Sequence, residues 1–174
     1  MKNLVLKVTL VSCALLGTSV AKAQDHAQWA QDHPQCYNLA SIKGSYGTVG
    51  TYGANVALAV AVRYYDGNGN FTATFIVNEP DPASTTGGRK IVTGTNVGTY
   101  TVNCDGTGQT HKTTTTATGI SAESTEDFVI TAAKVKHGQL IATSIDDAQE
   151  TPSAIVPGGI FLIHHLTRRP DDTE

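Results

Sequence analysis

The side chains of this sequence that could hold a metal ion include six histidines: His26, His33, His111, His137, His164 and His165. None of them shows the i, i+4 or H-x-H spacing that points two imidazoles at one ion, so their pattern is poor support for zinc. We therefore expect neither a metal site nor a cofactor.

His164 and His165 are neighbours in a segment that we expect to be a strand. Successive side chains of a strand point to opposite faces, so one of the two imidazoles must enter the interior of a barrel. A buried histidine is more often a hydrogen-bonded part of the core than a functional group. Both interpretations stay open.

Two pairs of adjacent carboxylates, Glu126-Asp127 and Asp146-Asp147, could supply a general acid or base. Adjacent strand residues diverge, however, and each pair lies near the expected end of a strand. The pattern favours solvated turn residues. The sequence contains no G-x-S-x-G motif for a nucleophilic serine.

Asp66, Asn68 and Asn70 have the spacing that opens an EF-hand calcium loop. The sixth position of such a loop should be Gly and is Phe71, and the twelfth should be Glu and is Val77. A hairpin turn explains these residues better than calcium binding does.

The first 23 residues are typical of a secretory signal peptide. Lys2 precedes an apolar run, and Ala21-Lys22-Ala23 matches an A-x-A cleavage site. We expect a secreted or periplasmic protein, cleaved after Ala23. A lipoprotein acylated at Cys13 is the alternative, but the sequence after Cys13 continues the apolar run instead of forming a polar tether.

We expect four segments: the signal peptide (1–23), a polar N-terminal leader (24–40), a single β domain (41–168) and a disordered tail (169–174). Cleavage leaves 9 of the 12 basic residues against 15 acidic ones, a net charge near −6. This charge disfavours nucleic acid as a partner. Lys7 interrupts the apolar run, so we expect no membrane span.

Two cysteines remain after cleavage, Cys36 and Cys104. An even pair in an oxidising compartment most simply forms one disulfide. A redox or metal role would need a close pair such as C-x-x-C, which is absent.

Alternating side chains and glycine-rich turns dominate the rest of the chain. The clearest example is 55–65, where Val56, Leu58, Val60, Val62 and Tyr64 share one face and alanines share the other. The expected strands are 42–49, 55–65, 71–77, 98–103, 110–118, 127–135, 139–145 and 160–167, with long loops at 79–88 and 146–157. No segment with helical periodicity is long enough to supply a βαβ crossover, so the expected fold class is all-β. An antiparallel up-and-down barrel of about eight strands hides both sheet edges, and a β-sandwich is the alternative.

Three stretches, 42–47, 65–72 and 98–108, resemble a family of secreted, mostly uncharacterised bacterial proteins. The resemblance covers Cys36 to Leu166. It implies a small β-barrel of the allene oxide cyclase-like or lipocalin-like kind, with a cup for an apolar ligand. The matching motifs are turns and strands, so the resemblance transfers no catalytic residue.

The leading hypothesis is a non-enzymatic protein that binds a small apolar ligand, because the small alanines of 55–65 can leave room inside a barrel. The candidate ligand-binding residues are Tyr46, Arg63, Tyr64, Tyr100, His164 and His165. One alternative is an enzyme of cyclase or isomerase type. Another is a structural or interaction module with a packed core. The sequence does not fix the oligomeric state.

Overall fold

The computed structural model describes residues 35–51, 57–81, 83–151 and 162–170. The predicted signal peptide, Cys13, most of the predicted leader and the end of the predicted tail lie outside these residues. No helix within the described ranges is long and apolar enough to cross a membrane.

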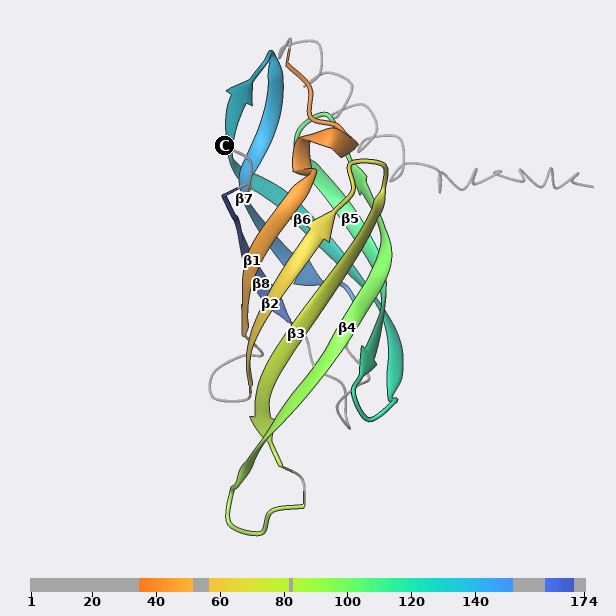
Figure 1. The fold of residues 1–174 in the computed structure, drawn as a ribbon, viewed down its shortest axis with the longest axis vertical. Coiled ribbons are helices and arrows are strands. Elements are labelled where there is room, and N and C mark those ends of the chain that lie inside the picture. The colour runs from red at the N-terminus through yellow and green to blue at the C-terminus, as the bar shows by residue number, and fades with distance from the viewer. Residues whose placement is uncertain (1–34, 52–56, 82, 152–161, 171–174) are drawn as a thin grey trace, which may run out of the picture.

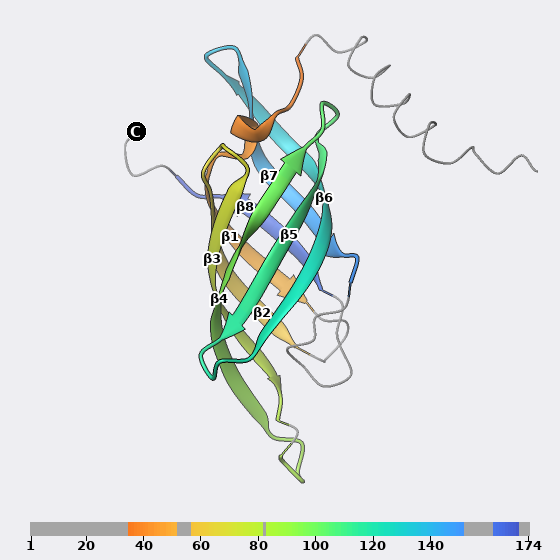
Figure 2. The ribbon, with the colours of Figure 1, turned by 90° about the vertical axis from the view of Figure 1, so that its right-hand side faces the viewer.

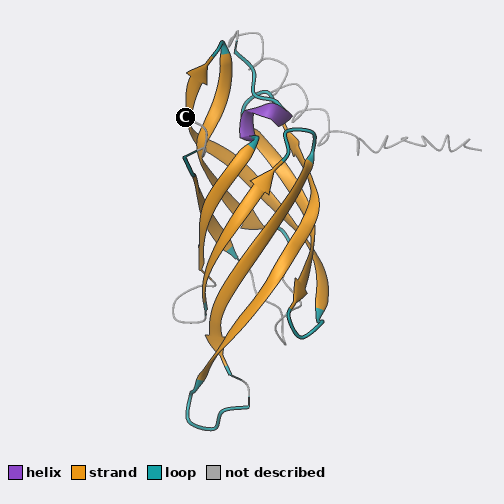
Figure 3. Cartoon of the chain, in the orientation of Figure 1, coloured by secondary structure: helices purple, strands orange, loops and turns teal. Residues whose placement is uncertain are grey.

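The chain forms one closed antiparallel barrel in which each strand pairs with the next and β8 closes against β1 (Figures 1 and 2). The strands are β1 (Gly44–Thr51), β2 (Leu58–Tyr65), β3 (Asn70–Pro80), β4 (Arg89–Val102), β5 (Thr107–Thr116), β6 (Ser121–Lys136), β7 (Gln139–Gln149) and β8 (Ile163–Arg168). A short 3₁₀ helix, η1 (Leu39–Ile42), lies over the upper end of the barrel as drawn in Figure 3. The predicted up-and-down barrel is confirmed, and closure leaves neither sheet edge unpaired.

Side-chain hydrogen bonds of Asp66 build the turn between β2 and β3. Its carboxylate accepts hydrogen bonds from the backbone N–H groups of Asn68 and Asn70 and from the Asn70 side chain. Gly67 and Gly69 have φ of 81° and 99°, a conformation that glycine adopts without strain. The predicted hairpin is confirmed.

From Leu58 to Val62, the alternation on β2 places small residues inside the barrel and large ones outside. Ala59 is buried, whereas Leu58 and Val60 are more than half exposed. The alanines leave the lower interior free for side chains from other strands, so the ring of Phe75 can enter it.

The largest differences from the sequence-based boundaries concern β3, β4, β6 and β7. β6 begins at Ser121 instead of 127. β4 begins at Arg89 instead of 98, and Glu79 and Pro80 end β3 instead of starting a loop. Pro80 is tolerated because it is the last residue of its strand. β7 continues through Gln149, so Asp146 and Asp147 are strand residues and not part of a loop.

The upper half of the barrel holds the main apolar core. Its buried members are Ile42, Tyr46, Tyr65, Phe71, Tyr100, Phe128, Ile130, Ala142, Ile145 and Leu166. The Tyr65 ring lies at the centre of an aromatic group, 5.0 to 5.7 Å from its three neighbouring rings. The predicted disulfide between Cys36 and Cys104 is present and ties the segment before η1 to the β4–β5 turn.

We predict that a Cys36→Ser/Cys104→Ser variant of the chain from Gln24 onward loses about 4 kcal/mol of unfolding free energy. The disulfide spans a sequence separation of 68 residues, so breaking it releases a long loop in the unfolded chain. Urea unfolding measures the loss. Reducing agent should destabilise the wild type equally and leave the variant unchanged. A loss below about 1 kcal/mol would contradict this prediction.

Candidate functional site

Five ionisable side chains meet inside the barrel, below the upper core. They are Arg63 from β2, Lys112 from β5, Glu126 from β6, Asp147 from β7 and His164 from β8. Each is at most 7% exposed, although charged residues are almost never fully buried unless they are paired. We refer to these five residues as the charged layer.

Arg63 connects the two carboxylates of the charged layer. Its Nη1 lies 2.6 Å from Asp147 Oδ2 and 3.2 Å from Glu126 Oε2. The other oxygen of Glu126 pairs with the ammonium of Lys112. With a neutral imidazole at His164, two cations balance two anions, so the layer carries no net charge.

The ionisation states follow from these contacts. Burial acts to raise the pKa of Asp147, but Arg63 and His164 outweigh burial and hold this pKa well below its ordinary value. Burial acts to lower the pKa of Arg63, and the carboxylates of Asp147 and Glu126 raise it above its ordinary value. Burial lowers the pKa of Lys112, although Glu126 opposes the shift. Asp147 and Arg63 are therefore charged at neutral pH.

Tyr65 lies at the boundary between the charged layer and the upper core. Burial raises the pKa of its phenol to about 12, although Arg63 opposes this shift. The phenol therefore stays protonated at neutral pH and adds no charge to the layer.

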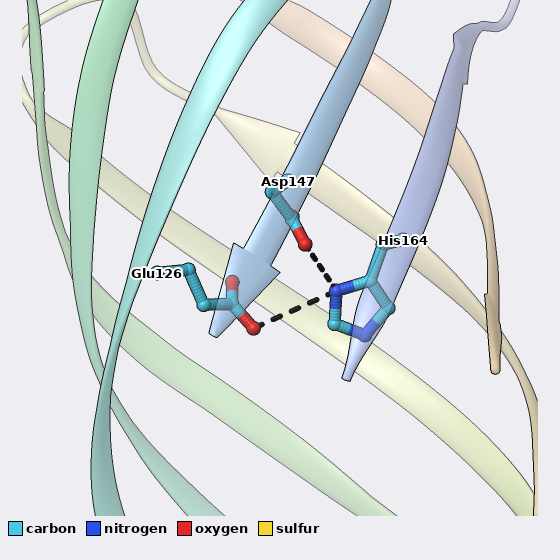
Figure 4. A group of neighbouring side chains, drawn as sticks. All are labelled: Glu126, Asp147 and His164. Carbon is cyan, nitrogen blue, oxygen red and sulfur yellow. Dashed lines mark hydrogen bonds and ion pairs between the residues drawn. The ribbon is translucent and has the colours of Figure 1, made fainter. Parts of the chain in front are cut away.

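The position of the proton on His164 follows from its two nearest contacts. Nδ1 lies 2.5 Å from Asp147 Oδ1 (Figure 4). It also lies 3.0 Å from Nη2 of Arg63. An ionised carboxylate can only accept and a guanidinium can only donate, so one tautomer cannot satisfy both. The shorter contact, to an ionised carboxylate, assigns the proton to Nδ1. In the neutral imidazole, the lone pair then lies on Nε2.

The strands β7 and β8 carry the same pair of residue types on their outer face. His165 is paired in register with Asp146, and its Nδ1 lies 2.5 Å from Asp146 Oδ1. Both side chains are largely solvent-exposed. The chain thus holds one histidine–aspartate pair inside the barrel and an equivalent pair outside it.

A small cavity separates the charged layer from the lower end of the barrel. The space open to the centre of a water-sized sphere is about 30 Å³. The apolar part of its wall consists of Ala59, Ala61, Phe75, Val77 and Leu162, with Gly50 beside them. The polar part consists of Thr48, Arg63, Asn96, Lys112, Thr114, Gln149 and His164. We call this space the interior cavity.

Besides Nε of Arg63, three uncharged polar atoms in the wall of the interior cavity lack a hydrogen-bond partner among the described residues. They are Thr48 Oγ1, Asn96 Oδ1 and Gln149 Nε2. All three residues are at least nine-tenths buried. A buried polar group without a partner costs about 1–3 kcal/mol, so native structures normally satisfy such groups with protein, water or ligand.

The predicted ligand-binding residues do not gather in one place. Arg63 and His164 line the interior cavity. Tyr46 and Tyr100 lie in the upper core, where their hydroxyls donate to the carbonyls of Ala142 and Leu39. Tyr64 is half exposed and His165 is mostly exposed, both on the outer surface. Of the two final histidines, His164 is the one that faces the interior of the barrel.

The prediction of solvated turn residues was wrong for Glu126 and Asp147, which are buried strand residues. The alternation of apolar residues along β6 and β7 indicated that these two carboxylates are buried, and the sequence-based prediction missed it. Glu126 shares its face with the apolar Phe128 and Ile130, and Asp147 shares its face with Ile145. Lys112, also missed, had no such signal, since its neighbours on both faces are threonines and other polar residues.

Ligand atoms of Glu126, Asp147 and His164 lie within 4.8 Å of one another, a spacing that could suit a metal ion. Both carboxylates, however, are already paired with Arg63 or Lys112. A metal ion at this place would lie against two buried cations and would have to displace them. The geometry therefore favours ion pairs between these side chains over a metal centre.

We predict that Arg63→Met lowers the unfolding free energy by about 3–5 kcal/mol, because it leaves two buried carboxylates without their shared cation. Chemical denaturation measures the change. Lys134→Met, at an exposed position of β6, is the control and should change the stability by less than about 0.5 kcal/mol. Equal effects of the two substitutions would show that the ion pairs of Arg63 contribute little to the unfolding free energy.

We predict that acid destabilises the protein through Asp147. The pKa of this group is lowered in the folded state, so its contribution is complete above the ordinary value of 3.8 and is lost as the pH falls through the folded-state pKa. Below pH 4, Asp147→Asn should reduce the slope of unfolding free energy against pH by up to about 1.4 kcal/mol per unit. The exposed Asp127→Asn is the control. Identical slopes in the wild type and Asp147→Asn would refute the lowered pKa of Asp147 in the folded state.

Comparison of the chain with known protein families, curated proteins and solved structures finds no match.

Proposed function

We propose that this protein binds a small, mainly apolar molecule with a neutral polar group in the interior cavity. The observation that carries this proposal is the set of three uncharged buried polar atoms without a partner, on Thr48, Asn96 and Gln149. They include acceptors and a donor, and they line one cavity. The interior cavity can therefore form hydrogen bonds with a hydroxyl or a carbonyl group of a ligand.

The charge balance of the charged layer restricts the ligand. Two cations already face two anions, so a charged ligand would add an unpaired charge to a site with little water. A neutral polar group avoids this penalty. The apolar part of the ligand would contact Ala59, Phe75 and Leu162 on the other side of the cavity.

The size of the cavity restricts the ligand further. A space of about 30 Å³ by the water-sphere measure holds about two waters or the polar end of a larger molecule. We expect the polar end to reach the charged layer and the remainder to extend toward the lower end of the barrel. The cavity also separates this proposal from a module with a fully packed core, in which no such space would remain.

The proposal includes the cellular compartment in which the protein acts. The predicted signal peptide and the Cys36–Cys104 disulfide are both compatible with an exported protein in an oxidising compartment. The resemblance to a family of secreted barrels stays a prediction.

A nuclear magnetic resonance titration tests the binding. Small neutral alcohols, ketones and phenols, with cyclohexanol and cyclohex-3-enone among them, are added to the ¹⁵N-labelled chain from Gln24 onward. We predict saturable shifts of the side-chain amide signals of Asn96 and Gln149, because these groups line the cavity. Absence of such shifts throughout the panel would refute the proposed function.

We predict that Ala59→Val weakens the binding of any ligand found in this way at least about tenfold, because two added methyl groups occupy the cavity. The same substitution at Ala133, on the exposed part of β6, is the control and should leave the affinity unchanged. Unchanged affinity in Ala59→Val would place the ligand elsewhere on the protein.

A further inference from the structure

We propose that His164 acts as a general base on the bound ligand, so that the interior cavity is the site of a proton-transfer isomerisation of a neutral carbonyl compound. This inference rests on the proposed ligand-binding function and adds a reaction to it. Three observations carry it: the position of His164 Nε2, the contact that fixes the imidazole, and the cation on the cavity wall.

His164 presents Nε2 on the side of its ring that faces away from both carboxylates (Figure 4). Both His164 and Gly50 line the interior cavity. A Cβ atom at position 50 would lie 2.4 Å from Cδ2 and 3.1 Å from Nε2 of the ring, so only glycine at this position leaves room for the imidazole. Within the described ranges, no hydrogen-bond partner occupies Nε2.

Asp147 is the positioning residue for this base. Its carboxylate accepts the Nδ1 proton of His164, which orients the ring and keeps the lone pair on Nε2. The same carboxylate would stabilise the imidazolium once Nε2 has taken a proton. Arg63 holds Asp147 in turn, with Nη1 2.6 Å from Oδ2.

Lys112 is the group that can stabilise a developing oxyanion. Lys112 lines the same cavity as His164. Glu126 links the two, because its Oε1 pairs with Lys112 and lies 3.6 Å from His164 Nδ1. An ammonium carries three protons and this pairing uses one, so others can donate to a ligand oxygen.

The reaction needs no other reactant. Nε2 of His164 removes a proton from the carbon next to the carbonyl, and the C–H electron pair becomes the C=C bond of an enolate. The negative charge moves to the ligand oxygen, opposite Lys112. When the substrate has a β,γ double bond, the imidazolium returns the same proton to the γ carbon, and the product is the conjugated isomer. The substrate class is therefore a small, neutral, enolisable ketone or aldehyde.

Cyclohex-3-enone is the probe, because its conversion to cyclohex-2-enone is observed directly by ultraviolet absorption. We expect the chain from Gln24 onward to accelerate this conversion, and His164→Gln to reduce the rate about 100-fold or more. Asp147→Asn should lower kcat with little change in KM, because it removes the group that orients the base. His165→Gln, the same change in the equivalent pair on the outer face, should keep the wild-type rate.

The outcomes distinguish this inference from the proposed function. Saturable binding of cyclohex-3-enone to the wild type without isomerisation above the buffer rate overturns the proton transfer and leaves ligand binding in place. A His164→Gln variant that retains the wild-type rate also overturns it. Failure of the entire panel to bind overturns both proposals.

A second measurement does not depend on the folding of any variant. ¹⁵N chemical shifts of the neutral His164 ring in the wild type report which nitrogen carries the proton. A proton on Nδ1 supports the inference. A proton on Nε2 overturns it, because Nε2 then has no lone pair with which to accept a proton from the ligand.

Discussion

The burial of Arg63 is the constraint on which the interior of this barrel depends. A guanidinium cannot lose its proton, so a fully buried arginine needs carboxylates within contact distance. Asp147 and Glu126 meet this need from two neighbouring strands, 84 and 63 residues further along the chain. The second oxygen of each carboxylate then needs its own partner, and these partners are His164 and Lys112. One buried cation thus accounts for the whole charged layer.

The charged layer divides the barrel into two halves with different roles. Above it, aromatic and aliphatic side chains pack closely under η1 and provide most of the buried apolar surface. Below it, alanines and one glycine replace large side chains, and polar atoms remain without partners. Stability and the proposed ligand binding therefore depend on different parts of the same strands. A packed upper half allows the lower half to retain a cavity.

The fold was predictable from the sequence because its signals are local. Alternation over a few residues predicts a strand, and residues such as Asp66 and Gly67 predict the turn that follows. The charged layer was not predictable in the same way. Its residues come from five strands, and only closure of the barrel brings Arg63 to within 3.0 Å of His164, 101 positions away. Glu126 and Asp147 were missed because a charged residue near the end of a strand is normally solvated. Only their apolar neighbours on the same face indicated otherwise.

The two histidine–aspartate pairs show what the interior adds to the chemistry of a side chain. His165 and Asp146 contact each other at the same distance as His164 and Asp147. In the outer pair, water screens the charges and competes for every hydrogen bond. In the inner pair, two further cations act on the aspartate through a medium of low polarity, and the imidazole cannot turn away. The same two residue types therefore form a solvated surface pair outside the barrel and an oriented, charge-balanced pair next to a cavity inside it. The side of the strand on which each residue lies makes the difference.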